Sequence, residues 1–188
     1  MNLIVAVDQN YGIGSGNELL YYIPEDLKFF KFKTLNKVIV MGSKTFLSLP
    51  DSAPLKNRTN IILTQNENLN AKGAIVANSI PALAEVLKSY NSDDIFVIGG
   101  ASVYTELLPF VKTAYVTKIE ATRPAESFFP DIEKEESWKL LDSSKKYVSS
   151  GISFSFLAFE NIAVKSLNDI KKPLNTKSKV PEPQCRQA

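Results

Sequence analysis

Short apolar, β-rich segments alternate with helical patterns over the first two thirds of the chain, and this order constrains the fold most strongly. The apolar segments cover residues 3–7, 38–41, 61–64, 74–76, 95–98 and 114–119. The helical patterns cover residues 24–33 and 43–49, the apolar stripe of Ile80, Leu83 and Leu87, and the stripe of Val103, Leu107 and Leu108. Strands joined through helices usually lie parallel, in a sheet that helices cover on both faces. We therefore expect an α/β domain.

Two further apolar segments follow at residues 138–141 and 152–159, separated by the polar stretch 142–151. No helical pattern lies between them, so the pair is typical of an antiparallel hairpin with a long turn. The sequence thus predicts a single domain over residues 1–160. Its core would be a mainly parallel eight-stranded sheet with a C-terminal antiparallel hairpin and helices on both faces.

Residues 161–188 differ in composition from the rest of the chain. They hold six basic and two acidic residues, three prolines and few apolar side chains, whereas residues 1–160 are weakly acidic. This pattern predicts a basic, largely disordered tail, with a short helix around residues 163–170 as an alternative. A weakly acidic body is not typical of a nucleic-acid binder.

No apolar stretch is long enough to span a membrane, and no signal-peptide pattern opens the chain, so we expect a cytoplasmic protein. We also expect a monomer.

Two absences restrict the chemistry. The 188 residues include no histidine, and the single cysteine is Cys185. A Cys/His zinc site and a histidine-dependent nucleophile are therefore excluded, and we expect no metal. Acid–base chemistry must use Asp, Glu, Tyr, Lys or water, so an enzyme of this composition is expected to depend on a cofactor.

Asp26 is the most informative candidate for acid–base chemistry. It lies in the first turn of the predicted helix over residues 24–33, four residues before Phe30 and therefore on the same helix face. If that face lines a pocket, burial raises the pKa of the acid toward neutrality. The alternative is an ordinary first-turn acid that faces the helix dipole after Pro24.

Three features indicate anion binding. Two strands end in glycine before a helix, at Gly42 and at Gly99-Gly100, and two such junctions suggest a dinucleotide held between helix starts. Neither junction is a Rossmann fingerprint or a Walker A loop. Arg58 precedes a strand, where it would either grip a substrate carboxylate or remain a solvated loop residue.

Taken in order, these segments resemble the dihydrofolate reductase family from Leu3 to Glu160. The resemblance rests on residues 12–14, 23–31, 41–49, 54–63 and 98–104, on Thr117, and on residues 129–131. It implies NADPH-dependent reduction of 7,8-dihydrofolate to 5,6,7,8-tetrahydrofolate.

The resemblance also implies roles for substrate-binding residues. Asp26, supported by Thr117, would hydrogen-bond the amino-pyrimidine edge of the pterin and assist protonation of ring nitrogen 5. The carbonyl of Ile98 would face the pterin, and Arg58 would bind the α-carboxylate of the glutamate tail. The pocket walls would be Ile4, Ala6, Leu27, Phe30, Leu49 and Leu55.

For NADPH the resemblance implies a larger set of residues and a cis peptide bond between Gly99 and Gly100. The loop over residues 9–22 would close over the nicotinamide. The implied cofactor-binding residues are Ala6, Ile13, Gly14, Leu19, Gly42, Ser43, Lys44, Thr45, Leu63, Thr64, Gln65, Asn78, Gly99, Gly100, Ala101, Ser102, Val103 and Tyr104.

Two positions depart from the family pattern. Tyr21 stands where a tryptophan usually holds a water near the pterin, and we expect its phenol to share catalysis with Asp26. Ser43 replaces a basic residue that usually binds the 2′-phosphate of the cofactor, which leaves the preference for NADPH over NADH open.

The alternatives to dihydrofolate reduction are another pteridine or pyrimidine reductase, such as the riboflavin-pathway enzyme, and a catalytically weak nucleotide-binding paralogue. The only partner expected is a small-molecule substrate, without metal, nucleic acid or membrane.

Overall fold

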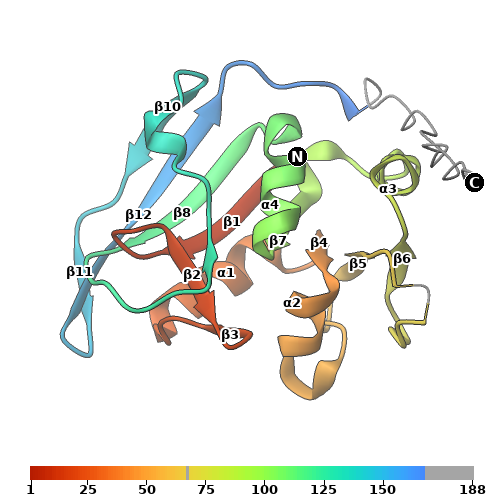
Figure 1. Ribbon diagram of the computed structural model, residues 1–188. Helices are drawn as coiled ribbons and strands as arrows, with labels where there is room; N and C mark the ends of the chain where they lie inside the picture. The colour runs from red at the N-terminus through yellow and green to blue at the C-terminus, as the bar shows by residue number, and fades with distance from the viewer. Residues whose placement is uncertain (67, 168–188) are drawn as a thin grey trace, which may run out of the picture.

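The computed structural model describes residues 1–66 and 68–167, and it is built around one large sheet (Figure 1). Six strands of this sheet run parallel, and two at one side run antiparallel to their neighbours. In spatial order the strands are β10 (Trp138–Ser143), β12 (Ile152–Asn161), β8 (Thr113–Ile119), β1 (Asn2–Val7), β7 (Ile95–Gly99), β4 (Val38–Gly42), β5 (Thr59–Leu63) and β6 (Ile75–Ala77). The predicted mainly parallel sheet is therefore confirmed, and the described residues add a ninth strand, β11 (Tyr147–Ser149), which pairs with β12 beside this row.

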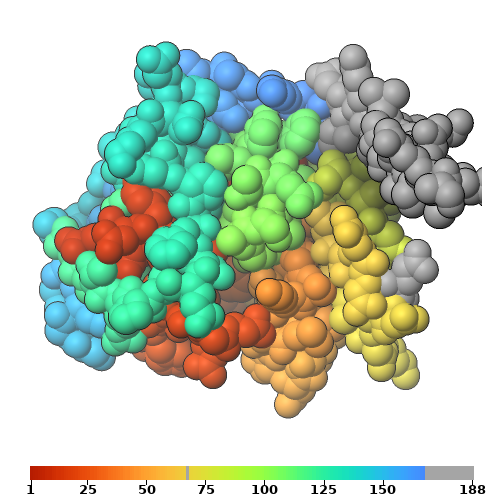
Figure 2. All heavy atoms as spheres, in the orientation of Figure 1, coloured from red at the N-terminus to blue at the C-terminus, as the bar shows by residue number. Residues whose placement is uncertain are grey.

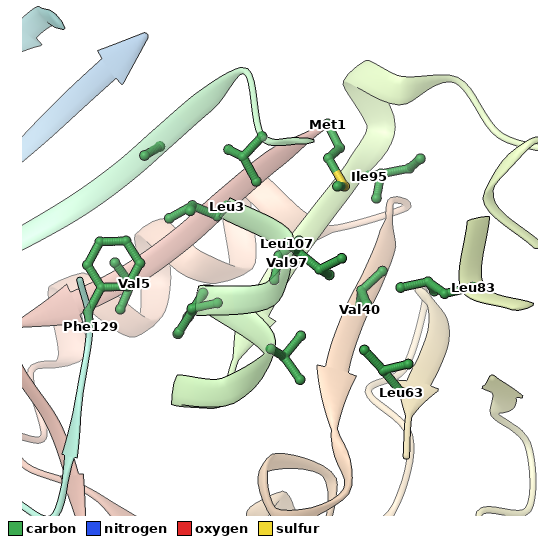
Figure 3. Packing of buried hydrophobic residues seen from close by; sticks show 14 of the residues in the cluster. Met1, Leu3, Val5, Val40, Leu63, Leu83, Ile95, Val97, Leu107 and Phe129 are labelled. Carbon is green, nitrogen blue, oxygen red and sulfur yellow. The ribbon is translucent and has the colours of Figure 1, made fainter. Parts of the chain in front are cut away.

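Side chains that alternate along each central strand build two separate layers of core. On β1, Leu3 and Val5 face one layer while Ile4 faces the other, as expected for a strand whose two faces are both covered. Val40 and Ile39 divide in the same way on β4. Figure 3 shows the first layer, in which Leu3, Val5, Val97 and Val40 from the sheet gather around Leu107.

The helices cover both faces as predicted. α3 (Ile80–Leu87) and α4 (Ala101–Leu107) pack on the face of Leu3 and Val40, while α1 (Pro24–Thr34) and α2 (Ser43–Ser48) cover the opposite face. α3 begins at the expected N-cap, where the hydroxyl of Ser79 accepts a hydrogen bond from the amide of Ala82. α4 ends at Leu107, and Leu108, the last residue of the expected stripe, begins a 3₁₀ helix and packs against the same core layer as Val103 and Leu107.

The C-terminal hairpin is confirmed, with one addition. β10 and β12 pair antiparallel, and β12 also pairs antiparallel with β8. The polar stretch expected to be only a turn contains the short strand β11 (Tyr147–Ser149), which folds back on the start of β12. This strand has only three residues, two of them exposed, which is too short to give a pattern in the sequence.

A second sheet of three very short strands was not predicted. β2 (Gly12–Ser15) pairs with β3 (Glu18–Leu19) and with β9 (Ser127–Phe128), which lies far away in the sequence. Two-residue strands and a glycine-containing strand carry little β propensity, so only long-range pairing defines them. This sheet joins the loop after β1 to the segment after β8 (Figure 1).

The remaining regular elements are short. They are the 3₁₀ helices η1 (Pro50–Ser52), η2 (Ser92–Asp94), η3 (Leu108–Phe110) and η4 (Ile132–Lys134). Of the predicted tail, residues 168–188 lie outside the described residues, and with them part of the helix suggested at residues 163–170; residues 162–166 form a turn and irregular chain. Among the helices that the structure describes, none is both long and apolar enough to cross a membrane.

Candidate active site

A deep cleft opens along the carboxyl ends of the parallel strands, where ligands of open α/β sheets usually bind. It encloses about 1910 Å³ between the ends of β1, β4, β5 and β7 and the helices α1, α2 and α4. In Figure 2 the surface is hollowed between the green atoms of α4 and the orange and red atoms of α2 and the loop after β1. The cleft is large enough for two ligands bound side by side.

Asp26 reaches this cleft from the first turn of α1, which begins at Pro24. The fully buried Thr117 of β8 donates its hydroxyl to Oδ1 of Asp26 at 2.6 Å. Burial raises the pKa of Asp26 above its ordinary value, and the hydrogen bond from Thr117 opposes this rise. The carboxyl group can therefore keep a proton at a pH where an exposed aspartate cannot.

The walls near Asp26 are apolar. Leu27 and Phe30 of α1 face Ile4 of β1, and Leu49 and Leu55 close the same part of the cleft. The carbonyl of Ile4 accepts a hydrogen bond from the buried hydroxyl of Tyr104 at 2.7 Å. A flat aromatic ring fits between such walls, with Asp26 at its edge.

Arg58 lies at the outer end of this apolar part. Its Nε donates to the hydroxyl oxygen of Thr34 at 2.9 Å, and that hydroxyl donates to the carbonyl of Phe30 at 2.8 Å. Its Nη1 donates to the carbonyl of Lys56 at a longer 3.3 Å. Burial lowers the pKa of Arg58, and no acidic side chain in the described ranges pairs with it. The guanidinium is thus oriented by its Nε and available to a carboxylate.

The other end of the cleft is formed by the two glycine junctions. A Cβ on Gly42 would lie 3.1 Å from Cγ2 of Val103, and one on Gly100 would lie 3.2 Å from Oγ1 of Thr45. Gly99 has a φ of +122°, and the peptide bond between Gly99 and Gly100 is cis, as the resemblance implied. Larger residues would push the starts of α2 and α4 apart, so the glycines keep this end narrow.

Nearly all the residues singled out in the sequence line this one cleft. They are Ile4, Ala6, Ile13, Gly14, Leu19, Asp26, Leu27, Phe30, Gly42, Ser43, Lys44, Thr45, Leu49, Leu55, Arg58, Leu63, Thr64, Gln65, Asn78, Ile98, Gly99, Gly100, Ala101, Ser102, Val103 and Tyr104. Thr117 lies behind Asp26 rather than on the surface of the cleft.

Tyr21 is placed differently. Its side chain is buried, and its hydroxyl has no hydrogen-bond partner among the described residues. It borders a separate cavity of about 20 Å³ that Asp26 also borders. A cavity of this size holds one water molecule. Burial raises the pKa of Tyr21, Asp8 raises it further, and Arg123 opposes the rise.

Four residues that matter to the site were not among those predicted from the sequence. Lys31 and Lys56 line the cleft beside Arg58, and Lys31 could have been inferred from its position one turn after Leu27 on the same helix face. Asp8 and Arg123 hold the loop that carries Tyr21. The bonds of Arg123 to Asp8 and to Leu20 join segments more than a hundred residues apart, so no local pattern reveals them.

Comparisons with known proteins agree with this geometry. The family model described as dihydrofolate reductase matches residues 1–161. The dihydrofolate reductase of Bacillus subtilis is 35% identical over 162 residues, which cover 85% of this chain and 94% of the relative. The dihydrofolate reductase of Buchnera aphidicola from Acyrthosiphon pisum is 39% identical over 145 residues, which cover 77% and 88%.

A solved structure, dihydrofolate reductase from Enterococcus faecalis complexed with NADP(H) and RAB-propyl, superposes with a TM-score of 0.73 at 31% identity. The superposition covers 85% of this chain and 95% of the other. Fold, cleft and sequence thus agree over nearly the whole length of the relatives, and this chain belongs to the dihydrofolate reductase family.

Proposed function

We propose that the protein reduces 7,8-dihydrofolate to 5,6,7,8-tetrahydrofolate with NADPH. The observation that carries this proposal is the half-buried Asp26, held by Thr117 at the edge of an apolar slot in the same cleft as the two glycine junctions. The relatives that match most of the chain bear the name dihydrofolate reductase.

The substrate would occupy the part of the cleft between Asp26 and Arg58. Asp26 accepts hydrogen bonds from the N–H groups on the amino-pyrimidine edge of the pterin, while Leu27 and Phe30 cover the ring faces. At the far end Arg58 presents its guanidinium to the α-carboxylate of the glutamate tail. Lys31 and Lys56 lie on the same rim and add positive charge toward that tail.

The cofactor would occupy the part of the cleft between α2 and α4. The close approach of Gly42 to Val103 and of Gly100 to Thr45 leaves backbone amides and the hydroxyls of Ser43 and Thr45 facing the cleft, which suits a pyrophosphate. Lys44 is the cation nearest these junctions in the sequence. NADPH, when bound, supplies the hydride that reduces the pterin.

The side chains of the protein must then deliver one proton to the pterin. Asp26 holds a proton because its pKa is raised, and it borders the cavity that Tyr21 also borders. A water in this cavity would accept a hydrogen bond from the phenol of Tyr21 and donate one to Asp26. The two side chains would thus orient a proton carrier beside ring nitrogen 5 of the pterin.

We also propose that the protein acts as a cytoplasmic monomer without a metal, nucleic acid or membrane as partner, and that residues 1–160 are the catalytic unit. No cluster of acidic residues within 1–66 and 68–167 is arranged to hold a metal ion. A chain that ends at residue 167 is expected to keep the full rate of turnover.

The test is NADPH oxidation, followed by absorbance, with dihydrofolate as substrate. The wild-type protein is expected to turn over, and a parallel assay with NADH measures the preference left open by Ser43. Absence of turnover with either cofactor would overturn the proposal in favour of a nucleotide-binding paralogue.

An Arg58→Leu variant tests the substrate. Loss of a charge-assisted contact to the glutamate tail is expected to raise KM for dihydrofolate about tenfold or more while kcat changes little. Lys56→Met is the matched control and is expected to raise KM less, because Lys56 is exposed at the rim. An unchanged KM in Arg58→Leu would favour a pteridine reductase whose substrate lacks this tail.

A further inference from the structure

Arg123 joins two segments that flank the candidate active site. It lies between β8 and β9, and this segment runs beside the loop of β2 and β3 (Figure 1). Its guanidinium carbon lies 4.4 Å from the centre of the Tyr21 ring. Its Nη1 donates to the carbonyl of Leu20 at 2.6 Å. The side chain therefore covers the Tyr21 ring and anchors the residue before it.

The main chain of Arg123 makes a different contact. Its amide donates to Oδ2 of the fully buried Asp8 at 3.2 Å. This bond involves no side-chain atom of Arg123, so it remains when the side chain is replaced. Arg123 is exposed, and its replacement leaves no hole in the core. The guanidinium can thus be removed without removing the support of the loop.

The side chain of Tyr21, which Arg123 covers, has one polar atom without a hydrogen-bond partner. The ring of Tyr21 packs with Leu20, Ile23, Ile119 and Phe154, but its hydroxyl is buried without a partner in the described part of the chain. Buried hydroxyl groups are normally hydrogen-bonded. Tyr21 and Asp26 both border the cavity that is large enough for one water, and a water there would be the partner that the hydroxyl lacks.

We propose that Arg123 is a positioning residue, whose guanidinium holds the Tyr21 phenol against the one-water cavity beside Asp26. This inference rests on the proposed function, in which Tyr21 and Asp26 orient the water. The position of the hydroxyl depends on the backbone at Tyr21 and on its χ1 angle. The bond to the Leu20 carbonyl fixes the backbone beside Tyr21, and the guanidinium over the ring face restrains χ1, so the hydroxyl stays in place.

The test is a double-mutant cycle of Tyr21→Phe and Arg123→Gln, read as kcat and KM for dihydrofolate. Loss of the phenol hydrogen bond is expected to lower kcat about five- to tenfold, with KM changed less than about twofold. Loss of the exposed cation over the ring is expected to lower kcat about two- to fivefold. The double variant is expected to match Tyr21→Phe, because Arg123 then has no hydroxyl to position.

Two further variants serve as controls for the double-mutant cycle. Arg123→Lys keeps a cation over the ring and is expected to recover part of the loss. Lys145→Gln removes a surface cation that lies 5.6 Å from the Tyr147 ring, away from the cleft, and is expected to leave kcat unchanged.

The outcomes separate the two proposals. Independent, multiplying losses in the double variant, or wild-type kcat in Arg123→Gln, would overturn the positioning role while dihydrofolate reduction stands. Wild-type kcat in Tyr21→Phe would overturn the roles of both Tyr21 and Arg123. Absence of turnover in the wild-type protein would overturn the proposed function and this inference with it.

Discussion

Two aspartates lie close to the same loop, and their surroundings differ. Asp8 follows β1 and is fully buried, and its carboxylate accepts hydrogen bonds from the backbone amides of Asn10, Gly12 and Arg123 at 2.8, 2.8 and 3.2 Å. Asp26 is half-buried at the cleft and accepts one hydrogen bond, from the Thr117 hydroxyl.

The comparison shows that burial alone does not identify a catalytic acid. Three backbone donors compensate the buried charge of Asp8 and use its oxygens to fix the loop after β1. A single hydroxyl compensates Asp26 incompletely, and burial raises its pKa. The acid with fewer partners is therefore the one suited to hold a proton and to bind a ligand.

The raised pKa of Asp26 also carries a cost in stability. The folded protein binds this proton more tightly than the unfolded chain does. Between the ordinary and the raised pKa of Asp26, the free energy of unfolding therefore falls as pH rises, and the cost persists at every higher pH. Asp26 is therefore expected to oppose folding at neutral pH.

The largest expected effect is on activity in Asp26→Asn. The amide keeps the shape of the side chain but cannot hold or release a proton, so kcat/KM at pH 7 is expected to fall about 100-fold or more. Steady-state NADPH oxidation measures it. Glu25→Gln is the control, because Glu25 is the neighbouring exposed acid, and it is expected to keep full activity. Undiminished turnover in Asp26→Asn would show that Asp26, like Asp8, is not a catalytic acid.

The next effect is on stability in Asp8→Ala. Three amides lose their acceptor, and the free energy of unfolding is expected to fall by about 2 kcal/mol. Urea unfolding followed by circular dichroism measures it, with the exposed Glu136→Ala as control. A loss below about 0.5 kcal/mol would mean that the amides find other partners and that Asp8 does not fix the loop.

A smaller effect is expected in Thr117→Val, which removes the hydrogen bond to Asp26 while keeping the volume of a buried residue. Since that bond lowers the pKa of Asp26, its loss should raise this pKa further and shift the pH profile of kcat upward. Asp26 is also held less firmly without this bond, so the limiting kcat at low pH is expected to fall about three- to tenfold, whereas the higher pKa offsets part of that loss at pH 7. Thr105→Val, whose hydroxyl bonds only to its own helix at Ala101, should leave the profile in place. An unshifted profile in Thr117→Val would assign the pH dependence to another group.

The sequence predicted those parts of the site that local signals determine. Asp26 follows Pro24 at the start of a helix, and Gly42 and Gly99 each end an apolar strand, so local signals marked them as candidates. The resemblance placed them in one site, and the structure brings them to one cleft. The resemblance supplied the pairing of Thr117 with Asp26, which the structure places at 2.6 Å.

Other parts depend on contacts between distant segments. β2 and β9 are more than a hundred residues apart, and their pairing brings Arg123 to Tyr21. Asp8 directly follows an apolar strand, but nothing in the local sequence marks the amide of Arg123 as its third donor. The separate cavity at Tyr21 is a void left by packing, and no residue pattern specifies a void.

The pH dependence of the single-turnover rate of dihydrofolate reduction tests the central role of Asp26 most directly. Wild type and Asp26→Asn would be compared from about pH 5 to about pH 9. The wild-type rate is expected to fall as pH rises through the raised pKa of Asp26, while the variant stays slow and nearly independent of pH. A wild-type rate that does not change with pH, or the same fall in Asp26→Asn, would contradict the account.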